Sequence, residues 1–146
     1  IGLCSNTSGQ IVLYLMVTPP QPGEESYDKY IHEKQSILGS LGRKAQQIAQ
    51  GLDAIEGIHC PTPRGAMYLF PRLELPKNKD YGGKAPDFCF CETLVKEEGI
   101  VTVPGSGFGQ LPGTQHLRMT FLPPEEKIPY ILERFQVCYE KFVASK

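Results

Sequence analysis

The chain has 146 residues, with 15 Lys and Arg against 16 Asp and Glu. This is the length of one ordinary domain, enough to bury a core. The nearly balanced charge argues against nucleic acid or a membrane surface as the main partner. The longest apolar run, Ile11–Val17, is too short to span a bilayer.

The five cysteines follow no spacing typical of a disulfide framework or a zinc site. Cys89 and Cys91 form only a C-x-C pair, and Cys60 lies far from them along the chain. We therefore predict buried free thiols in a reducing compartment and no metal.

The apolar run near the N-terminus is predicted to be a short helix. Small polar residues precede it, and Ser5, Thr7 or Ser8 are the expected caps. The double proline Pro19-Pro20 is expected to stop it. Because the run is apolar on nearly all sides, we expect it to be buried against another segment, inside this chain or outside it.

A long amphipathic helix is predicted from Glu24 to Asp53, because apolar residues recur there at three- and four-residue steps. Gly39 and Gly42 interrupt the pattern and favour a bend. His32 lies off the apolar stripe and is interpreted as a solvated surface histidine.

Beyond this helix the hydrophobic period changes to two. Ile58–Cys60 and Ala66–Phe70 are predicted strands, the second of them buried, with a turn containing Arg64 between them. The segment Leu73–Ala85 has the composition of an exposed loop.

Two further helices and another strand are predicted downstream. The first helix is Asp87–Glu98, ended by Gly99 and followed by a strand at Ile100–Val103. A proline and acid cluster from Pro123 marks the start of the last helix. The residues predicted to face inward are Phe88, Cys91, Leu94 and Val95 in the first helix and Ile128, Ile131, Leu132, Phe135, Cys138, Tyr139 and Phe142 in the second. Short strands among segregated helices indicate an α/β (α+β) fold, a small sheet packed with helices.

The segment Val101–Phe121 holds the main candidate site residue. Its last strand buries Leu117, Met119 and Phe121 on one face and turns Arg118 to the other. An arginine presented in this way suits a carboxylate or phosphate, because its planar fork donates two parallel hydrogen bonds. The alternative is an edge-strand arginine paired with a surface carboxylate.

The glycine-rich loop before that strand is a weaker motif. Gly105, Gly107 and Gly109 follow a strand, but Pro112 forbids the helix that a dinucleotide fingerprint needs, and no P-loop lysine follows. We interpret the glycines as allowing a tight turn and a close backbone approach. Ser106 has no base partner in a nucleophile motif, so no catalytic residue is predicted.

Long stretches of the chain resemble the C-terminal part of the alanine aminotransferases, pyridoxal-phosphate enzymes of the aspartate-aminotransferase fold. The matching segments are LCSNTSGQ (3–10), TPP (18–20), GEESYDKY (23–30), GIHCPTPRGAMYLFPRL (57–73) and VPGSGFGQLPGTQHLRMTFLPP (103–124). The last segment is the most specific. The fold implied is the C-terminal small domain of aminotransferase fold type I, with a small antiparallel or mixed sheet packed with helices.

The resemblance also implies roles and boundaries. Arg118 matches the arginine that binds the α-carboxylate of the substrate, and Gly65 and Tyr68 match the turn and strand that support this side of the active site. Residues 1–20 would be the end of the large domain or its linker, and residues 21–146 the small domain. The implied reaction moves an amino group between L-alanine and 2-oxoglutarate, giving pyruvate and L-glutamate.

The family's cofactor is pyridoxal 5'-phosphate, but no lysine here stands in a serine-rich Schiff-base motif. The resemblance therefore implies a piece of an enzyme that is inactive alone, with the cofactor-binding residues of this chain unknown. Small amino and keto acids would be the partners, without nucleic acid or membrane, in a homodimer of the full-length enzyme. The expected location is cytoplasmic, with mitochondria as the alternative.

Two alternatives stay open. The chain could be the small domain of another enzyme of this fold, such as a kynurenine aminotransferase or an aminocyclopropane carboxylate synthase. It could also be a non-catalytic binding or oligomerisation module. Substrate profiling of the intact protein distinguishes an alanine aminotransferase from the other enzymes of this fold. A Schiff-base lysine in the sequence upstream of residue 1 would argue against the non-catalytic module.

Overall fold

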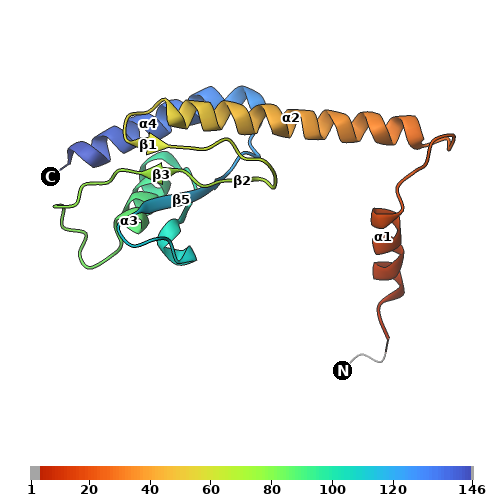
Figure 1. The fold of residues 1–146 in the computed structure, drawn as a ribbon, viewed down its shortest axis with the longest axis horizontal. Coiled ribbons are helices and arrows are strands. Elements are labelled where there is room, and N and C mark those ends of the chain that lie inside the picture. The colour runs from red at the N-terminus through yellow and green to blue at the C-terminus, as the bar shows by residue number, and fades with distance from the viewer. Residues whose placement is uncertain (1–3, 146) are drawn as a thin grey trace. The chain divides into compact units, whose positions relative to one another are not determined.

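The computed structural model describes residues 4–145, which form four α-helices and five short strands (Figure 1). These residues group into two compact units, one through Leu38 and one from Gly39 on. The first unit holds α1 (Thr7–Val17) and the first turns of α2 (Tyr27–Asp53). The second unit holds everything that follows, including the sheet and the core.

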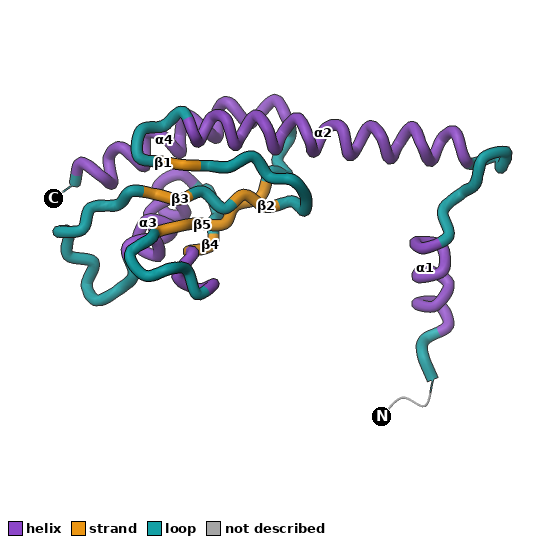
Figure 2. The backbone as a smooth tube through the Cα atoms, viewed as in Figure 1, coloured by secondary structure: helices purple, strands orange, loops and turns teal. Residues whose placement is uncertain are grey.

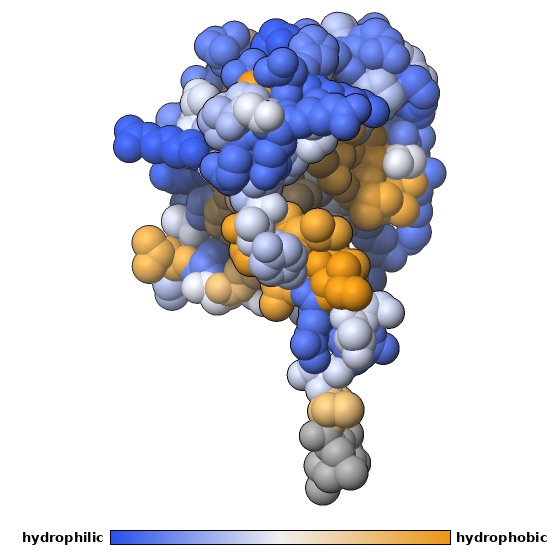
Figure 3. Space-filling model, turned by 90° about the vertical axis from the view of Figure 1, so that its right-hand side faces the viewer, coloured by the Kyte–Doolittle hydropathy of each residue, from blue (hydrophilic) through white to orange (hydrophobic). Residues whose placement is uncertain are grey.

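Helix α1 forms where the sequence predicts it and ends before the double proline. Its cap is Asn6, whose side chain accepts a hydrogen bond of 3.0 Å from the Gly9 amide, so the expected Ser5, Thr7 or Ser8 cap is wrong. Each side chain from Ile11 to Val17 is more than half exposed. Figure 3 shows this apolar surface in orange above the grey N-terminal residues.

Helix α2 begins three residues later than predicted and continues through both of its glycines. Only the C-terminal part of its apolar stripe is buried, and Ile37 and Leu38 of the first half are exposed. His32 is exposed, as predicted. The buried α2 residues are Lys44, Ala45, Ile48, Ala49 and Leu52.

The sheet is organised around its longest strand. Its strands are β1 (Ile58–His59), β2 (Tyr68–Leu69), β3 (Arg72–Leu73), β4 (Val103–Pro104) and β5 (Gln115–Thr120), and all their pairings are antiparallel. Strands β2 and β3 pair with one edge of β5 in a single register, interrupted at Pro71, and β1 extends the sheet beyond β3. Strand β4 pairs with the other edge of β5 (Figure 2). Strand β5 is therefore central.

The two faces of the sheet differ in burial. The inner face contributes Leu69, Leu73, Leu117 and Met119 to the same hydrophobic core as the helices, which therefore cover it. The outer face is half-buried or exposed. The predicted strand Ala66–Phe70 is correspondingly wrong in two respects. Its first residues are not in a strand, and Leu69 is its buried residue.

Helix α3 (Pro86–Thr93) continues as a π-helical turn, Leu94–Glu98, and ends at Gly99, whose φ of 67° is the left-handed cap that the sequence predicts. Its inward side differs from the prediction. Cys91 and Leu94 are buried as expected, but Phe88 and Val95 are exposed, and Asp87 and Phe90 lie inside instead.

Phe90 is the centre of the aromatic core. It is fully buried and meets three rings of α4 (Ile128–Ala144) edge-on, with centroids 5.7 Å away for Phe135 and Tyr139 and 5.2 Å for Phe142. These rings belong to the inward stripe predicted for the last helix, and Ile128 and Cys138 of that stripe are also buried. The predicted α+β architecture, a small sheet packed with helices, is confirmed.

All five cysteines are free. Cys60, Cys91 and Cys138 are buried as predicted, whereas Cys4 is exposed and Cys89 half-buried. Burial raises the pKa of the Cys60 and Cys138 thiols to about 11, which keeps both protonated and unreactive. Within residues 4–145 no helix is long and apolar enough to cross a membrane, and no cluster of metal-ligating side chains forms.

Candidate functional site

Arg118 lies on the outer face of the central strand. The alternation of β5 buries Leu117 and Met119 and leaves Arg118 half-buried on the opposite side, as the sequence predicts. Val103 of β4 is its cross-strand partner. With strands on both edges, the backbone of Arg118 is held by the sheet, so its side chain starts from a fixed position.

Two aromatic rings flank Arg118 on this face, and two more side chains pack beside them. We call these residues the outer-face cluster: Tyr68, Phe70, Phe108, His116 and Arg118. The guanidinium carbon of Arg118 lies 4.7 Å from the Tyr68 ring centre and 4.6 Å from that of Phe108. Phe70 stacks on His116 at 4.9 Å and meets Phe108 edge-on at 6.0 Å. The cluster joins β2, β5 and the glycine loop.

This arrangement suits an anionic ligand. Rings near the guanidinium stabilise its charge through cation–π contacts without using its N–H donors. Among the described residues Arg118 forms no ion pair, so the alternative of a surface carboxylate partner is not realised there. A planar carboxylate is the ligand whose two oxygens match the fork.

The glycine loop serves this site through its shape. Residues Gly105–Phe108 form one 3₁₀ turn, and Gly109 ends it with φ of 71°. A Cβ on Gly105 would lie 2.8 Å from the carbonyl oxygen of His116, a contact that backbone atoms cannot relieve easily. The close approach expected from the sequence is therefore found at Gly105, and the loop carries Phe108 towards Arg118.

Tyr68 and Gly65 are the other two residues to which the resemblance gives a role, and only Tyr68 belongs to the outer-face cluster. Tyr68 lies beside Arg118, which the sequence pattern alone did not reveal. Gly65 stands in the preceding turn, where an added Cβ would meet nothing within 4 Å apart from its chain neighbours. The next residue, Ala66, has φ of 59°, an uncommon value for a residue with a side chain.

The most informative residue that the sequence analysis missed is Asp87. The sequence predicts it to start a helix, but its carboxylate is fully buried and accepts hydrogen bonds from Ser106 and Gln110 of the glycine loop. An acidic residue directly after a proline is typical of a helix N-terminus, which masks any other role. The signal available was an acid within an otherwise apolar helix start.

Four of the lysines are engaged in contacts within the protein itself. Lys44 is buried, but its amine donates to the Leu122 carbonyl at 3.3 Å. Lys79 holds the Phe142 carbonyl at 3.2 Å at the other end of the fold. Lys84 and Lys96 both pair with Glu92 on the surface. These contacts fasten helices and loops, and no step through the cofactor is derived from this chain.

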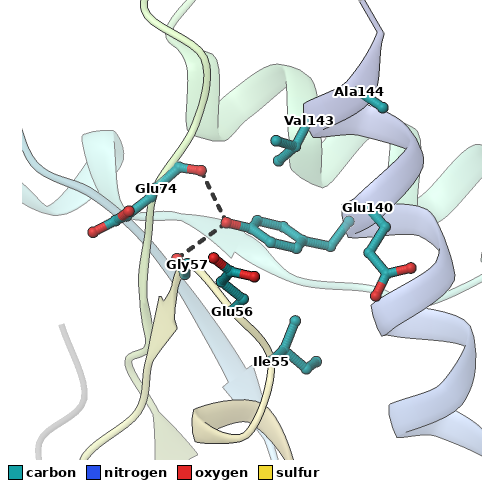
Figure 4. A pocket seen from close by; sticks show the side chains of 8 residues that line it. Ile55, Glu56, Gly57, Glu74, Glu140, Val143 and Ala144 are labelled. Carbon is teal, nitrogen blue, oxygen red and sulfur yellow. Dashed lines mark hydrogen bonds between the residues drawn. The ribbon is translucent and has the colours of Figure 1, made fainter.

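A hollow outside this site, drawn in Figure 4, lies where the turn before β1 and the residue after β3 meet α4, and it is a structural joint. Three carboxylates surround it, yet its central hydroxyl, on Tyr139, is engaged by the Gly57 and Glu74 carbonyl oxygens at 3.0 and 2.9 Å. Burial raises the pKa of Tyr139, which keeps the hydroxyl protonated as a donor. The carboxylates are those of Glu56, Glu74 and Glu140.

Gly57→Ala is expected to destabilise this joint. Gly57 has φ of 83°, and a Cβ there would lie 2.5 Å from the Tyr139 hydroxyl oxygen, so backbone strain adds to loss of the hydroxyl's hydrogen bonds. We expect a loss of roughly 2–3 kcal/mol in the opening free energy of α4 amides, measured by native-state hydrogen exchange.

Gly82→Ala is the matched control, because Gly82 also has positive φ (60°) but open space around it. Gly82→Ala therefore measures the cost of positive φ alone, because its added Cβ meets nothing within 4 Å apart from its chain neighbours. Equal losses at Gly57 and Gly82 would contradict the role of the Tyr139 contact.

Comparison with known proteins identifies the class. The family model described as "Aminotransferase class I and II" matches residues 3–135. The chain therefore belongs to the class I and II aminotransferases, a family whose cofactor is generally pyridoxal phosphate.

Individual relatives within this family include alanine aminotransferases. The chain is 48% identical to alanine aminotransferase 1, mitochondrial, of Arabidopsis thaliana and 43% identical to glutamate–glyoxylate aminotransferase 2 of the same plant. These alignments cover 98% and 99% of this chain but 27% and 31% of the relatives, so the chain spans less than a third of their length. The solved alanine aminotransferase from Pyrococcus furiosus superposes with a TM-score of 0.73 at 29% identity, over 95% of this chain and 31% of that one. The fold is thus that of aminotransferase fold type I.

Proposed function

We propose that this chain is the substrate-binding small domain of a pyridoxal-phosphate-dependent alanine aminotransferase. The reaction exchanges an amino group between L-alanine and 2-oxoglutarate, giving pyruvate and L-glutamate. The observation that carries the proposal is Arg118, held on a central strand between two aromatic rings and without an ion-pair partner among the described residues. The 48% identity to an alanine aminotransferase supports the choice of substrates.

Arg118 acts by positioning. Its two parallel N–H donors bind the α-carboxylate that alanine, glutamate and both keto acids share, and this fixes the direction of the reacting carbon. Holding a substrate in a reactive geometry can supply several kcal/mol of barrier reduction. Tyr68 and Phe108 restrict the motion of the guanidinium and shield its charge from water.

The cofactor is assigned to other parts of the full-length enzyme, because no lysine of this chain stands in a serine-rich Schiff-base motif. Alone, the chain is expected to be inactive and to form no specific adduct with pyridoxal phosphate. We assign residues 1–20 to the end of the large domain or its linker and residues 21–146 to the small domain. The exposed apolar side chains of α1 support that boundary, since they need cover in the whole enzyme.

The assembly proposed is a homodimer of the full-length enzyme. Its compartment is the cytoplasm or the mitochondrion, and mitochondrial alanine aminotransferases stand among the relatives. Small amino and keto acids are the proposed partners.

An assay of the full-length protein tests the proposal. With alanine and 2-oxoglutarate we expect pyruvate and glutamate in equal amounts. Kynurenine as the amino donor and formation of aminocyclopropane carboxylate serve as comparisons for the other enzymes of this fold. Activity only in one of those comparisons would replace the alanine assignment, and activity in none would favour a non-catalytic module.

With glutamate as the amino donor, glyoxylate is a second candidate acceptor beside pyruvate. The relative named glutamate–glyoxylate aminotransferase favours it. Glyoxylate carries the same carboxylate for Arg118 but no methyl group. Comparing kcat/KM for pyruvate and glyoxylate with glutamate as the donor distinguishes the two acceptors.

A further inference from the structure

We propose that Asp87, Gln110 and His116 form a hydrogen-bonded chain that positions the glycine loop so that Phe108 orients Arg118 for its carboxylate ligand. This inference rests on the proposed function of Arg118. It assigns positioning roles to residues that never touch the substrate.

The chain begins at a buried charge. Asp87 is fully buried, and a carboxylate in that setting is costly unless several donors satisfy it. One oxygen accepts from its neighbour Phe88 at 2.9 Å. The other accepts from the Ser106 amide at 2.6 Å and the Gln110 side-chain amide at 3.0 Å. Two of the three donors thus come from the glycine loop, which Asp87 ties to α3.

Gln110 transmits this tie to the central strand. Because an oxygen of Asp87 accepts here, the NH₂ group of Gln110 faces it, and the amide oxygen faces His116. That oxygen lies 3.0 Å from Nδ1 of His116, so the imidazole carries its proton on Nδ1. Burial, and then the charge of Arg72, lowers the pKa of His116 and favours this neutral form.

The imidazole then fixes the aromatic rings. His116 stacks almost parallel to Phe70, at 8°, and Phe70 meets Phe108 edge-on. Phe108 therefore has two restraints, the tied loop below it and the Phe70 ring beside it. Its contact with Arg118 at 4.6 Å is the end of the chain.

Orientation matters because a bidentate contact demands that guanidinium and carboxylate be coplanar. If the loop loosens, Phe108 no longer restrains one side of the guanidinium, and more of its rotations compete with the productive one. The effect is specific to ligands that carry the carboxylate. A substrate without it gains nothing from the orientation of Arg118.

The test compares alanine with ethylamine, which is alanine without its carboxylate, as amino donors for the full-length enzyme. The variant is Gln110→Met, which keeps the length of the side chain and removes both hydrogen bonds. We expect the ratio of kcat/KM for alanine to that for ethylamine to fall about tenfold, the loss of roughly one hydrogen bond to a charged group, with the ethylamine rate unchanged. Gln136→Met is the matched control, because Gln136 is exposed and bonds only Glu140.

A second variant protects the test against misfolding. Phe108 is 47% exposed, so Phe108→Leu is tolerated and is expected to lower the same ratio. Hydrogen exchange at the Ser106 amide gives an independent readout, and we expect Gln110→Met to accelerate it.

The outcomes distinguish failure of this inference from failure of the proposed carboxylate binding by Arg118. In an Arg118→Lys enzyme, Gln110→Met should lower the ratio no further, because both changes remove the same effect. An unchanged ratio in Gln110→Met and Phe108→Leu, while Arg118→Lys lowers it, overturns the positioning chain alone. Equal losses for alanine and ethylamine also overturn it. An unchanged ratio in Arg118→Lys rejects the carboxylate receptor itself.

Discussion

Arg118→Lys in the full-length enzyme is expected to reduce kcat/KM for alanine and for 2-oxoglutarate by roughly tenfold to a hundredfold. Lysine keeps the charge but offers a point donor in place of the planar fork, so the bidentate contact is lost. A hydrogen bond to a charged group is worth about 1.5–3 kcal/mol, which gives that range. Both substrates suffer because both carry the α-carboxylate. Steady-state kinetics measure the change.

Arg64→Lys is the matched control. It is the same chemical change, and Arg64 is exposed in the turn before β2. We expect it to leave both rates within a factor of two. The stability of the Arg118 variant should stay close to that of the parent, since Arg118 is half-buried and forms no ion pair among the described residues. Unchanged kcat/KM for both substrates would remove Arg118 from the site.

Phe90→Ala is expected to cost about 3–5 kcal/mol of stability, the largest effect of any single core change considered. The ring is fully buried between α3 and α4, so its removal loses three edge-on aromatic contacts and leaves a cavity. Native-state hydrogen exchange at amides of α4 measures the loss as a lower opening free energy.

Phe88→Ala provides the comparison, because Phe88 stands two residues away on the same helix and is 42% exposed. We expect a loss below about 1 kcal/mol there, in the range of surface substitutions. Comparable losses at Phe88 and Phe90 would contradict the observed orientation of α3.

The contrast between these two residues also explains where sequence reasoning succeeds. In β5 polar and apolar residues alternate, so the pattern predicted the inward Leu117 and Met119 and the outward Arg118 correctly. In α3 the run Phe88–Cys91 is apolar at every position, so no face is marked. The helix instead takes the rotation that brings Asp87 to the loop amides and Phe90 to α4.

The aromatic contacts of Arg118 could not be predicted from the local sequence pattern either. Tyr68 comes from a strand 50 residues earlier in the chain, and Phe108 from the loop before β5. Their meeting depends on strand register and on the close approach of Gly105, neither of which is encoded in a short window. Family resemblance supplied the role proposed for Arg118, whereas the contacts around it required the folded chain.

A crystal structure of the full-length enzyme with bound 2-oxoglutarate tests the central claim most directly. We expect both oxygens of the α-carboxylate to lie about 3 Å from nitrogen atoms of Arg118, with the guanidinium still flanked by Tyr68 and Phe108. An α-carboxylate bound elsewhere, with Arg118 paired to a carboxylate of the protein, would contradict it.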